Sequence, residues 1–222
     1  MNVDEISKTL VESNILQNAS EGGFTLSPEF TRSIDRITEN IEMEGVSEDY
    51  LSEDVRSEEL LSTLSEIFEE SPVVVAYYCA IQQFIPSLSH DRTVQITATL
   101  LRFDREPELV SGVPDQFLPV RGEVIPGLVK LTKKAIVYVW DEDCEPCDLV
   151  KGDLENTLED DNREISLFAV YGPASSKILY ENYDVVGAPT TLFFVNGAVD
   201  ARLQGAYEPA VVEIEVDKLH SM

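Results

Sequence analysis

Apolar side chains recur every three to four positions through most of the first hundred residues. This spacing places them on one face of a helix and predicts five helices, at residues 3–17, 28–45, 52–70, 73–85 and 89–103. Ser27-Pro28 and Ser71-Pro72 supply an N-cap and a first-turn proline for two of these helices. The fourth helix is apolar almost all round, which is typical of a helix at the centre of a core.

The pattern changes after residue 130, where continuous apolar runs alternate with segments of helical spacing. Strands are predicted near residues 117–120 and at 135–140, 165–170, 190–195 and 201–205. Helices are predicted just before Lys133-Lys134, from the cysteine pair through 149–158, at 174–183 and at 210–219. A continuous apolar run is typical of a strand that is buried on both faces, and Asn196-Gly197 is a strong hairpin signal. These features predict a mixed sheet with helices on both faces.

Prolines and glycines gather between the two patterns, over residues 104–130. We therefore expect a mostly α-helical domain of unknown role at residues 1–105, a linker at 106–115 and an α/β domain at 116–222. A chain of 222 residues with 43% hydrophobic content is long enough for two small cores. The first domain contains no catalytic motif, so its expected role is to engage a protein partner or to present a substrate.

The chain carries a formal net charge of −26, and the acidic excess runs along its whole length. Uniform acidity with few lysines predicts a protein adapted to molar salt, such as a haloarchaeal protein, because hydrated carboxylates keep its surface soluble. Dense charge is also typical of disorder, but the regular apolar periodicity argues against disorder here. Lys8 is the only lysine before Lys130, so nucleic-acid binding is not expected, although a winged-helix arrangement of the first domain is an alternative.

The N-terminal sequence has no basic start and no apolar core, so it does not resemble a signal peptide. No apolar run is long enough to span a membrane, and no membrane partner is expected. Three cysteines fit a reducing compartment, and we expect the protein to be cytoplasmic.

The chemistry of the chain centres on Cys144-Glu-Pro-Cys147, which lies where a buried strand runs into a helix. A thiol at a helix N-terminus is favoured as thiolate, and a second thiol one turn later is close enough to form a reversible disulfide. A zinc site is an alternative, but the remaining candidates, Cys79, His90 and His220, are not at ligand spacing. A purely structural disulfide is another, although so small a loop removes little unfolded-chain entropy.

Several motifs in the second half fall in the order and spacing of one known family. They are Trp140, Cys144-Glu-Pro-Cys147, Gly187-Ala188-Pro189-Thr190, Asn196-Gly197 and Gly205. On these residues the segment from about 112 to 222 resembles the thioredoxin family. The resemblance implies a thioredoxin-like α/β fold and protein-disulfide oxidoreductase activity in cell redox homeostasis, with protein disulfides and an upstream reductase as partners. It implies no cofactor and no metal.

The resemblance also implies roles for individual residues. Cys144 and Cys147 would form the redox-active disulfide, with Cys144 as the attacking thiol. Pro189 would be cis and lie against the cysteine pair, with Ala188 and Thr190 shaping the substrate groove and Trp140 packing under the site. A trans proline at a strand edge, where its missing N–H is tolerated, is the alternative.

Three positions depart from the family pattern. Asp143 and Glu145 replace a tryptophan and a glycine, and Tyr138 replaces the buried carboxylate that takes a proton from the second thiol, so slower resolution by Cys147 is expected. Asp143, Glu145 and the neighbouring acidic residues surround the thiols with negative charge. This charge predicts a higher Cys144 pKa than in a neutral site and repulsion of acidic partners at low salt. These carboxylates can also be ordinary solvated surface. The alternative function is therefore a non-catalytic redox sensor or protein-binding adaptor.

Overall fold

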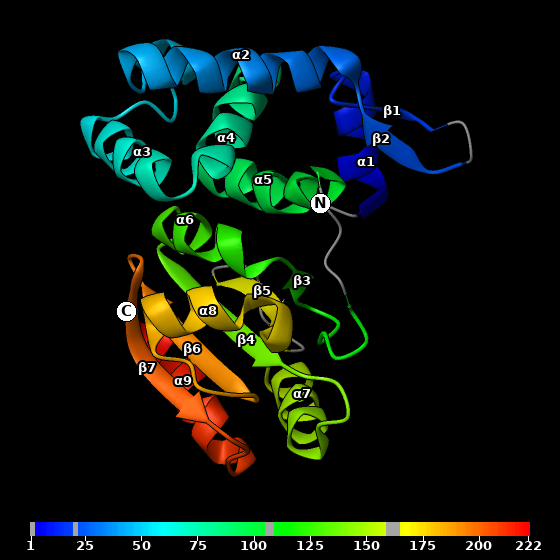
Figure 1. The fold of residues 1–222 in the computed structure, drawn as a ribbon, viewed down its shortest axis with the longest axis vertical. Coiled ribbons are helices and arrows are strands. Elements are labelled where there is room, and N and C mark those ends of the chain that lie inside the picture. The colour runs from blue at the N-terminus through cyan, green and yellow to red at the C-terminus, as the bar shows by residue number, and fades with distance from the viewer. Residues whose placement is uncertain (1–2, 20–21, 105–108, 159–164) are drawn as a thin grey trace. The chain divides into compact units, whose positions relative to one another are not determined.

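The computed structural model describes residues 3–19, 22–104, 109–158 and 165–222 (Figure 1). The chain divides into two compact units, residues 1–104 and 105–222, and each has its own hydrophobic core. Residues 106–108 of the expected linker lie outside the described residues.

The N-terminal unit is mainly helical. Its elements are α1 (Val3–Glu12), β1 (Leu16–Asn18), β2 (Phe24–Leu26), α2 (Pro28–Glu44), η1 (Glu48–Tyr50), α3 (Glu58–Glu70), α4 (Pro72–Phe84) and α5 (His90–Asp104). Helices α2, α3 and α5 contact α4, and every residue of α4 from Val74 to Gln82 is buried. The expected central position of this all-apolar helix is confirmed.

Two predicted helix bounds in this unit are wrong. The first helix ends at Glu12, because Asn14 adopts a left-handed backbone with φ of 56° and the following residues pair with β2 as an antiparallel hairpin. Apolar spacing alone did not show this short hairpin. The third helix begins at Glu58 and not at residue 52, because the Ser57 side chain accepts the Leu60 N–H at 3.1 Å and caps the first turn.

Cys79 lies on α4 with no exposed surface, and burial raises the pKa of its thiol to about 12. Iodoacetamide at pH 8 should therefore alkylate the partly exposed Cys144 in the reduced, folded protein and leave Cys79 unmodified until denaturant is added. Peptide mass mapping of the labelled sites measures this. Rapid labelling of Cys79 in the folded protein would contradict its burial.

The raised pKa also makes the contribution of Cys79 to stability fall as pH rises above 9, because the thiol of the unfolded chain ionises first.

The C-terminal unit is built on one sheet. Its elements are β3 (Leu118–Pro119), η2 (Gly122–Val124), α6 (Ile125–Lys130), β4 (Lys134–Trp140), α7 (Glu145–Thr157), β5 (Ser166–Tyr171), α8 (Gly172–Tyr183), β6 (Thr190–Val195), β7 (Ala198–Gln204) and α9 (Pro209–Ser221). The strand order is β3-β5-β4-β6-β7. Strand β5 is parallel to β3 and β4, whereas β6 is antiparallel to β4 and β7, so the predicted mixed sheet is confirmed.

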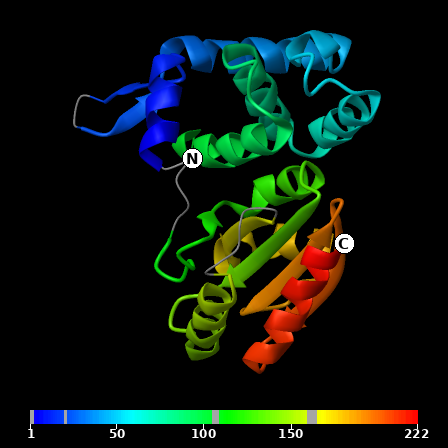
Figure 2. The same cartoon turned by 180° about the vertical axis from the view of Figure 1, so that it is seen from behind.

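Helices cover both faces of this sheet, as Figures 1 and 2 show from opposite sides. Ile136, Tyr138 and Trp140 alternate along β4 and point into a cluster that also contains buried side chains of α7 and α9. Residues between them, such as Val139, face the side of α8. Because successive side chains point to opposite faces, this register brings Tyr138 and Trp140 beneath the start of α7.

Among the described residues, none of the helices is both long and apolar enough to cross a lipid bilayer.

Candidate active site

The site forms where β4 ends and α7 begins. After Trp140 the chain turns through three acidic residues, of which Asp143 has a left-handed backbone with φ of 49°. Aspartate tolerates this conformation better than most residues. Cys144 follows as the N-cap of α7, and its carbonyl accepts the N–H groups of Cys147 and Asp148 at 2.8 and 3.2 Å. The turn therefore presents the sulfur of Cys144 at the positive end of a 13-residue helix.

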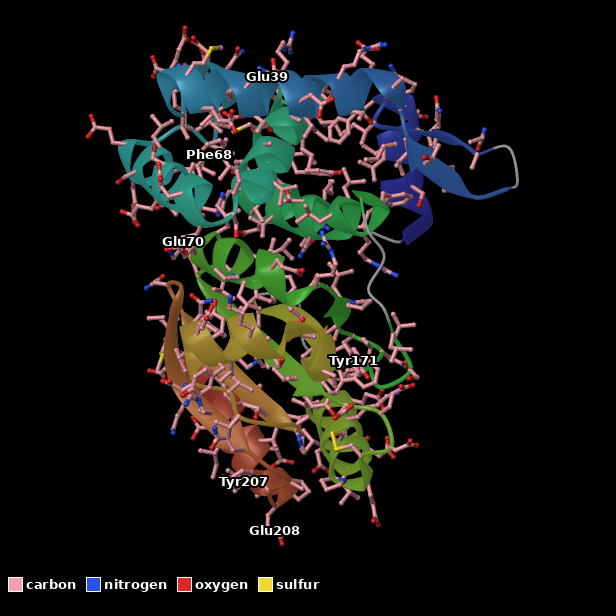
Figure 3. The ribbon with its side chains drawn as sticks, in the orientation of Figure 1. Glu39, Phe68, Glu70, Tyr171, Tyr207 and Glu208 are labelled. Atoms are coloured by element: carbon pink, nitrogen blue, oxygen red, sulfur yellow. A yellow bond between two sulfur atoms is a disulfide. The ribbon has the colours of Figure 1, made fainter. Side chains whose placement is uncertain are left out.

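Cys144 and Cys147 form a disulfide with an S–S distance of 2.06 Å, drawn in yellow at α7 in Figure 3. The Cys144 side chain is partly exposed, whereas Cys147 is only 3% exposed. The Cys144 sulfur also accepts the backbone N–H of Cys147 at 3.2 Å. A substrate sulfur can therefore approach Cys144 but not Cys147, and an N–H group is already in place to stabilise a Cys144 thiolate.

Pro189 precedes β6, and the Ala188–Pro189 peptide bond is cis. Thr190 pairs with Val139 across the antiparallel β4–β6 ladder, so Pro189 lies beside the end of β4 from which the cysteine turn departs. The Pro189 carbonyl accepts the N–H of Gly205 at 2.8 Å. The register thus brings the proline and the turn that carries the disulfide, 45 residues apart in sequence, to the same end of the neighbouring strands β4 and β6.

Thr190 does not face solvent. Its side chain is 1% exposed, and its hydroxyl donates to the Gly187 carbonyl at 2.7 Å. This bond closes the turn that carries Ala188, which is partly exposed. Thr190 therefore positions the loop before β6, while Ala188 is the residue of this loop that a substrate could contact.

Trp140, the single tryptophan of the chain, lies under the site with only 1% of its surface exposed. Its ring packs against Tyr171 with ring centroids 5.1 Å apart. The other neighbour is Gly112: a Cβ built on this glycine would lie 2.1 Å from an indole carbon, so the backbone lies directly against the ring. The indole Nε1 has no acceptor among the described residues.

Residues 109–117, which we name the strap, hold Gly112 in this position. Leu109 and Val113 pack against the cluster that contains Trp140 and Cys147. Three hydrogen bonds join the strap to α7: the Lys151 amine donates to the Ser111 carbonyl, the Asp115 N–H to a Glu155 carboxylate oxygen, and the Gln116 amide to the Glu155 carbonyl. The sequence placed most of these residues in a linker, and no local signal marks their contact with α7.

Tyr138 stands at the position where the family resemblance implies a buried carboxylate. It is fully buried, and its hydroxyl donates to the Cys147 carbonyl at 2.8 Å. Burial raises the pKa of Tyr138 above its usual value, and the nearby Asp148 carboxylate raises it further. The phenol therefore stays protonated at neutral pH, where it fixes α7 to the sheet and accepts no proton from a thiol.

Changing Tyr138 to phenylalanine should lower the free energy of unfolding of the C-terminal unit by about 1–2 kcal/mol, because a buried hydrogen bond to Cys147 is lost. Trp140 fluorescence during urea unfolding measures this unit. Tyr180→Phe is the matched control, since Tyr180 is 59% exposed on α8. Equal effects of the two changes would show that the bond to the Cys147 carbonyl contributes nothing to stability.

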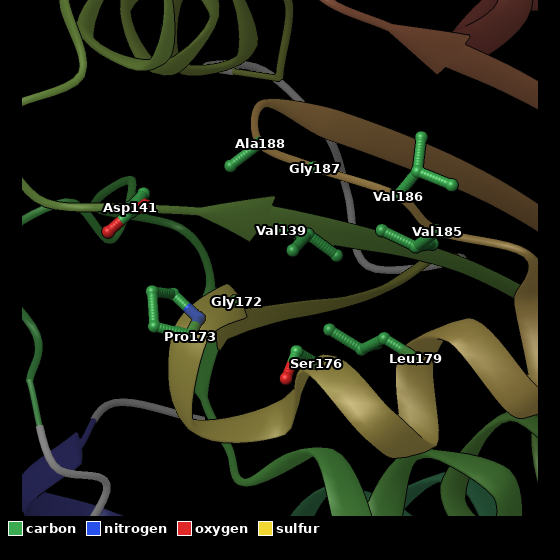
Figure 4. Close-up of a pocket in the computed structure, with 10 residues that line it drawn as sticks. All are labelled: Val139, Asp141, Gly172, Pro173, Ser176, Leu179, Val185, Val186, Gly187 and Ala188. Carbon is green, nitrogen blue, oxygen red and sulfur yellow. The ribbon is translucent and has the colours of Figure 1, made fainter.

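A pocket of about 190 Å³ opens beside Asp141, the first residue of the turn that leads from β4 to Cys144 (Figure 4). Its lining residues are Val139, Asp141, Gly172, Pro173, Ser176, Leu179, Val185, Val186, Gly187 and Ala188. They come from the end of β4, the first turns of α8 and the loop before Pro189. Most of the side chains are aliphatic, and Asp141 supplies the carboxylate.

In the described part of the chain, no group of three or more His, Cys, Asp or Glu side chains is placed to hold a metal ion. No protein-family model matches the sequence, and no curated protein matches it. Among solved structures, the chain is similar to the thioredoxin of Malassezia sympodialis (Mala s 13), with 22% identity and a TM-score of 0.36 over 39% of this chain and 75% of that one. A likeness at these values decides neither the fold nor the activity of this chain.

Proposed function

We propose that this protein is a thiol-disulfide oxidoreductase whose C-terminal unit has a thioredoxin-like fold and exchanges disulfides with other proteins. One observation carries the proposal: a partly exposed Cys144 caps α7 and is joined to a buried Cys147 at the end of β4, beside which Pro189 leads into β6. A disulfide with only structural value would not need one sulfur accessible at a helix N-terminus. The exchange needs no cofactor beyond the two sulfurs.

In the reducing direction, the Cys144 thiolate attacks one sulfur of a substrate disulfide. A Cys144–substrate disulfide forms, and the first substrate sulfur leaves as a thiolate and takes a proton from water. Cys147 then loses its proton and attacks the Cys144 sulfur, which releases the second substrate thiol. Two electrons and two protons pass to the substrate, and the protein is left with the Cys144–Cys147 disulfide. A dithiol reductant returns the protein to its starting state.

The surrounding residues support these steps in different ways. Ala188 and Pro189 would shape the groove through which a substrate reaches Cys144, while Thr190 holds their loop and Trp140 packs beneath the turn. Tyr138 takes no proton from Cys147 at neutral pH, so water or buffer accepts that proton during resolution. A reducing cytoplasm would keep the dithiol available, and the helical N-terminal unit would engage a partner or substrate protein.

Tyr138 also favours a second candidate function, a redox-sensing adaptor. If Tyr138 supplies no base for Cys147, the attack of Cys147 on a mixed disulfide is slow and repeated turnover is poor. In that case the disulfide would report oxidation to a partner of the N-terminal unit, without repeated turnover.

Reduction of insulin by dithiothreitol, in about 2–3 M KCl to screen the charge of the chain, separates the two candidates. Repeated turnover that requires both Cys144 and Cys147 supports the oxidoreductase. Oxidation of one equivalent of protein without turnover supports the sensor. Absence of any exchange with insulin or with a small neutral disulfide would overturn both.

A further inference from the structure

Negative charge surrounds the accessible sulfur without a local counter-charge. The carboxylates lie on the turn after β4 and on the first turn of α7; they are Asp141, Glu142, Asp143, Glu145 and Asp148. All five are partly or fully exposed, and within the described ranges none of them forms a salt bridge. Their charge is therefore available to a molecule that approaches Cys144.

Basic residues are absent from the segments that build the site. There is no lysine or arginine from residue 135 to 150, and none from 178 to 201, which includes the loop before Pro189. The first basic residue of α7, Lys151, donates its amine to the Ser111 carbonyl of the strap. A cationic ligand would meet attraction on this side of the site and an anionic ligand repulsion.

The pocket beside Ala188 is a separate observation that points to a ligand. Val139, Leu179 and Val185 give it an aliphatic wall, and Val186 stands 78% exposed at its edge. Figure 4 shows Ala188 across this pocket from Pro173 and Ser176, with Asp141 at one end between them. An aliphatic side chain of a bound polypeptide would lose water there, close to the carboxylates.

We propose that the preferred substrate is a disulfide in a basic polypeptide, with lysine or arginine next to the half-cystine and an aliphatic side chain on its other side. The basic side chain pairs with carboxylates of the turn, chiefly Asp143 and Glu145, and the aliphatic side chain enters the pocket beside Ala188. This inference rests on the proposed disulfide exchange and adds to it the class of substrate.

Disulfide-linked dimers of three blocked tripeptides test the preference: Lys-Cys-Leu, Glu-Cys-Leu and Lys-Cys-Ser. The rate constant for oxidation of the reduced protein is divided by the rate constant of the same peptide with dithiothreitol, which removes intrinsic differences in reactivity. We expect the lysine peptide to react at least about tenfold faster than the glutamate peptide at about 0.1 M KCl, and the ratio to approach one above about 1 M KCl. Leucine should be several-fold better than serine at both salt concentrations.

Two charge-matched double variants locate the effect. Asp143→Asn with Glu145→Gln should reduce the lysine-to-glutamate ratio several-fold. Asp200→Asn with Asp217→Asn should leave this ratio unchanged. Asp200 lies on β7, level with the start of β4 and therefore at the end of the sheet away from the cysteines, and Asp217 is an exposed residue of α9. Trp140 fluorescence checks that each protein is folded at the salt concentration used.

Equal rates for the lysine and glutamate peptides at low salt would overturn the substrate class and leave disulfide exchange standing. An unchanged ratio in the site variant would show that Asp143 and Glu145 do not select the substrate. If even bis(2-hydroxyethyl) disulfide fails to oxidise the protein, the proposed function itself is wrong.

Discussion

Replacing Cys147 by serine is expected to leave the protein able to attack a disulfide once but unable to release the product, so a mixed disulfide through Cys144 accumulates. The reason is the unequal exposure of the two sulfurs: Cys144 is accessible, whereas Cys147 is 3% exposed and acts only on a sulfur already bound to Cys144. Steady-state turnover should fall by on the order of 10³-fold or more, as for the loss of an essential catalytic group. Mass spectrometry of the reduced variant mixed with a disulfide peptide measures the adduct.

Two further variants control this result. Cys144→Ser should form no adduct, since its remaining site thiol is buried, and Cys79→Ala should behave as the unmodified chain. An adduct through Cys147 in the Cys144→Ser protein, formed as fast as the adduct through Cys144, would reverse the assigned order of attack.

The sequence predicted the parts of the C-terminal unit that depend on local pattern. The run from Ala135 to Trp140 is buried on both faces and became the central strand β4. Asn196 and Gly197 both have positive φ, as a tight hairpin turn requires, although β7 begins at Ala198 and not at residue 201. The closing helix forms at Pro209–Ser221 despite an alternating apolar pattern. Turn type and strand burial depend on residues that are close together in the chain, so they can be predicted from a single sequence.

The candidate site was predictable in its sulfurs and not in its surroundings. The family resemblance implied that Tyr138 stands in place of a carboxylate, but the hydrogen bond to the Cys147 carbonyl depends on how α7 docks against β4. The strap shows the same limit, since Asp115 and Glu155 bond across 40 positions. The pocket combines three separate segments that meet only after the sheet has formed. Contacts of this kind follow from tertiary packing, which a pattern in one segment does not encode.

A substitution in the strap should change the stability of the C-terminal unit by a large amount. Gly112→Ala should lower the free energy of unfolding of this unit by about 1–3 kcal/mol, the usual cost of adding a methyl group to a packed core. The added Cβ would lie 2.1 Å from one Trp140 ring carbon and within 2.7 Å of two others, so the strap or the indole must move. Movement of the strap would also loosen its bonds to Glu155.

Urea unfolding followed by Trp140 fluorescence measures this change, because the chain has no other tryptophan. Gly152→Ala is the matched control with the opposite expected sign: Gly152 lies within α7, a Cβ there meets nothing within 4 Å, and alanine favours a helix by about 0.5–1 kcal/mol over glycine. The Gly112 variant should therefore unfold at lower urea than the unmodified chain and the Gly152 variant at higher urea. An unchanged midpoint for Gly112→Ala would mean that the strap does not press against Trp140 in solution, and that the floor of the site is open to water.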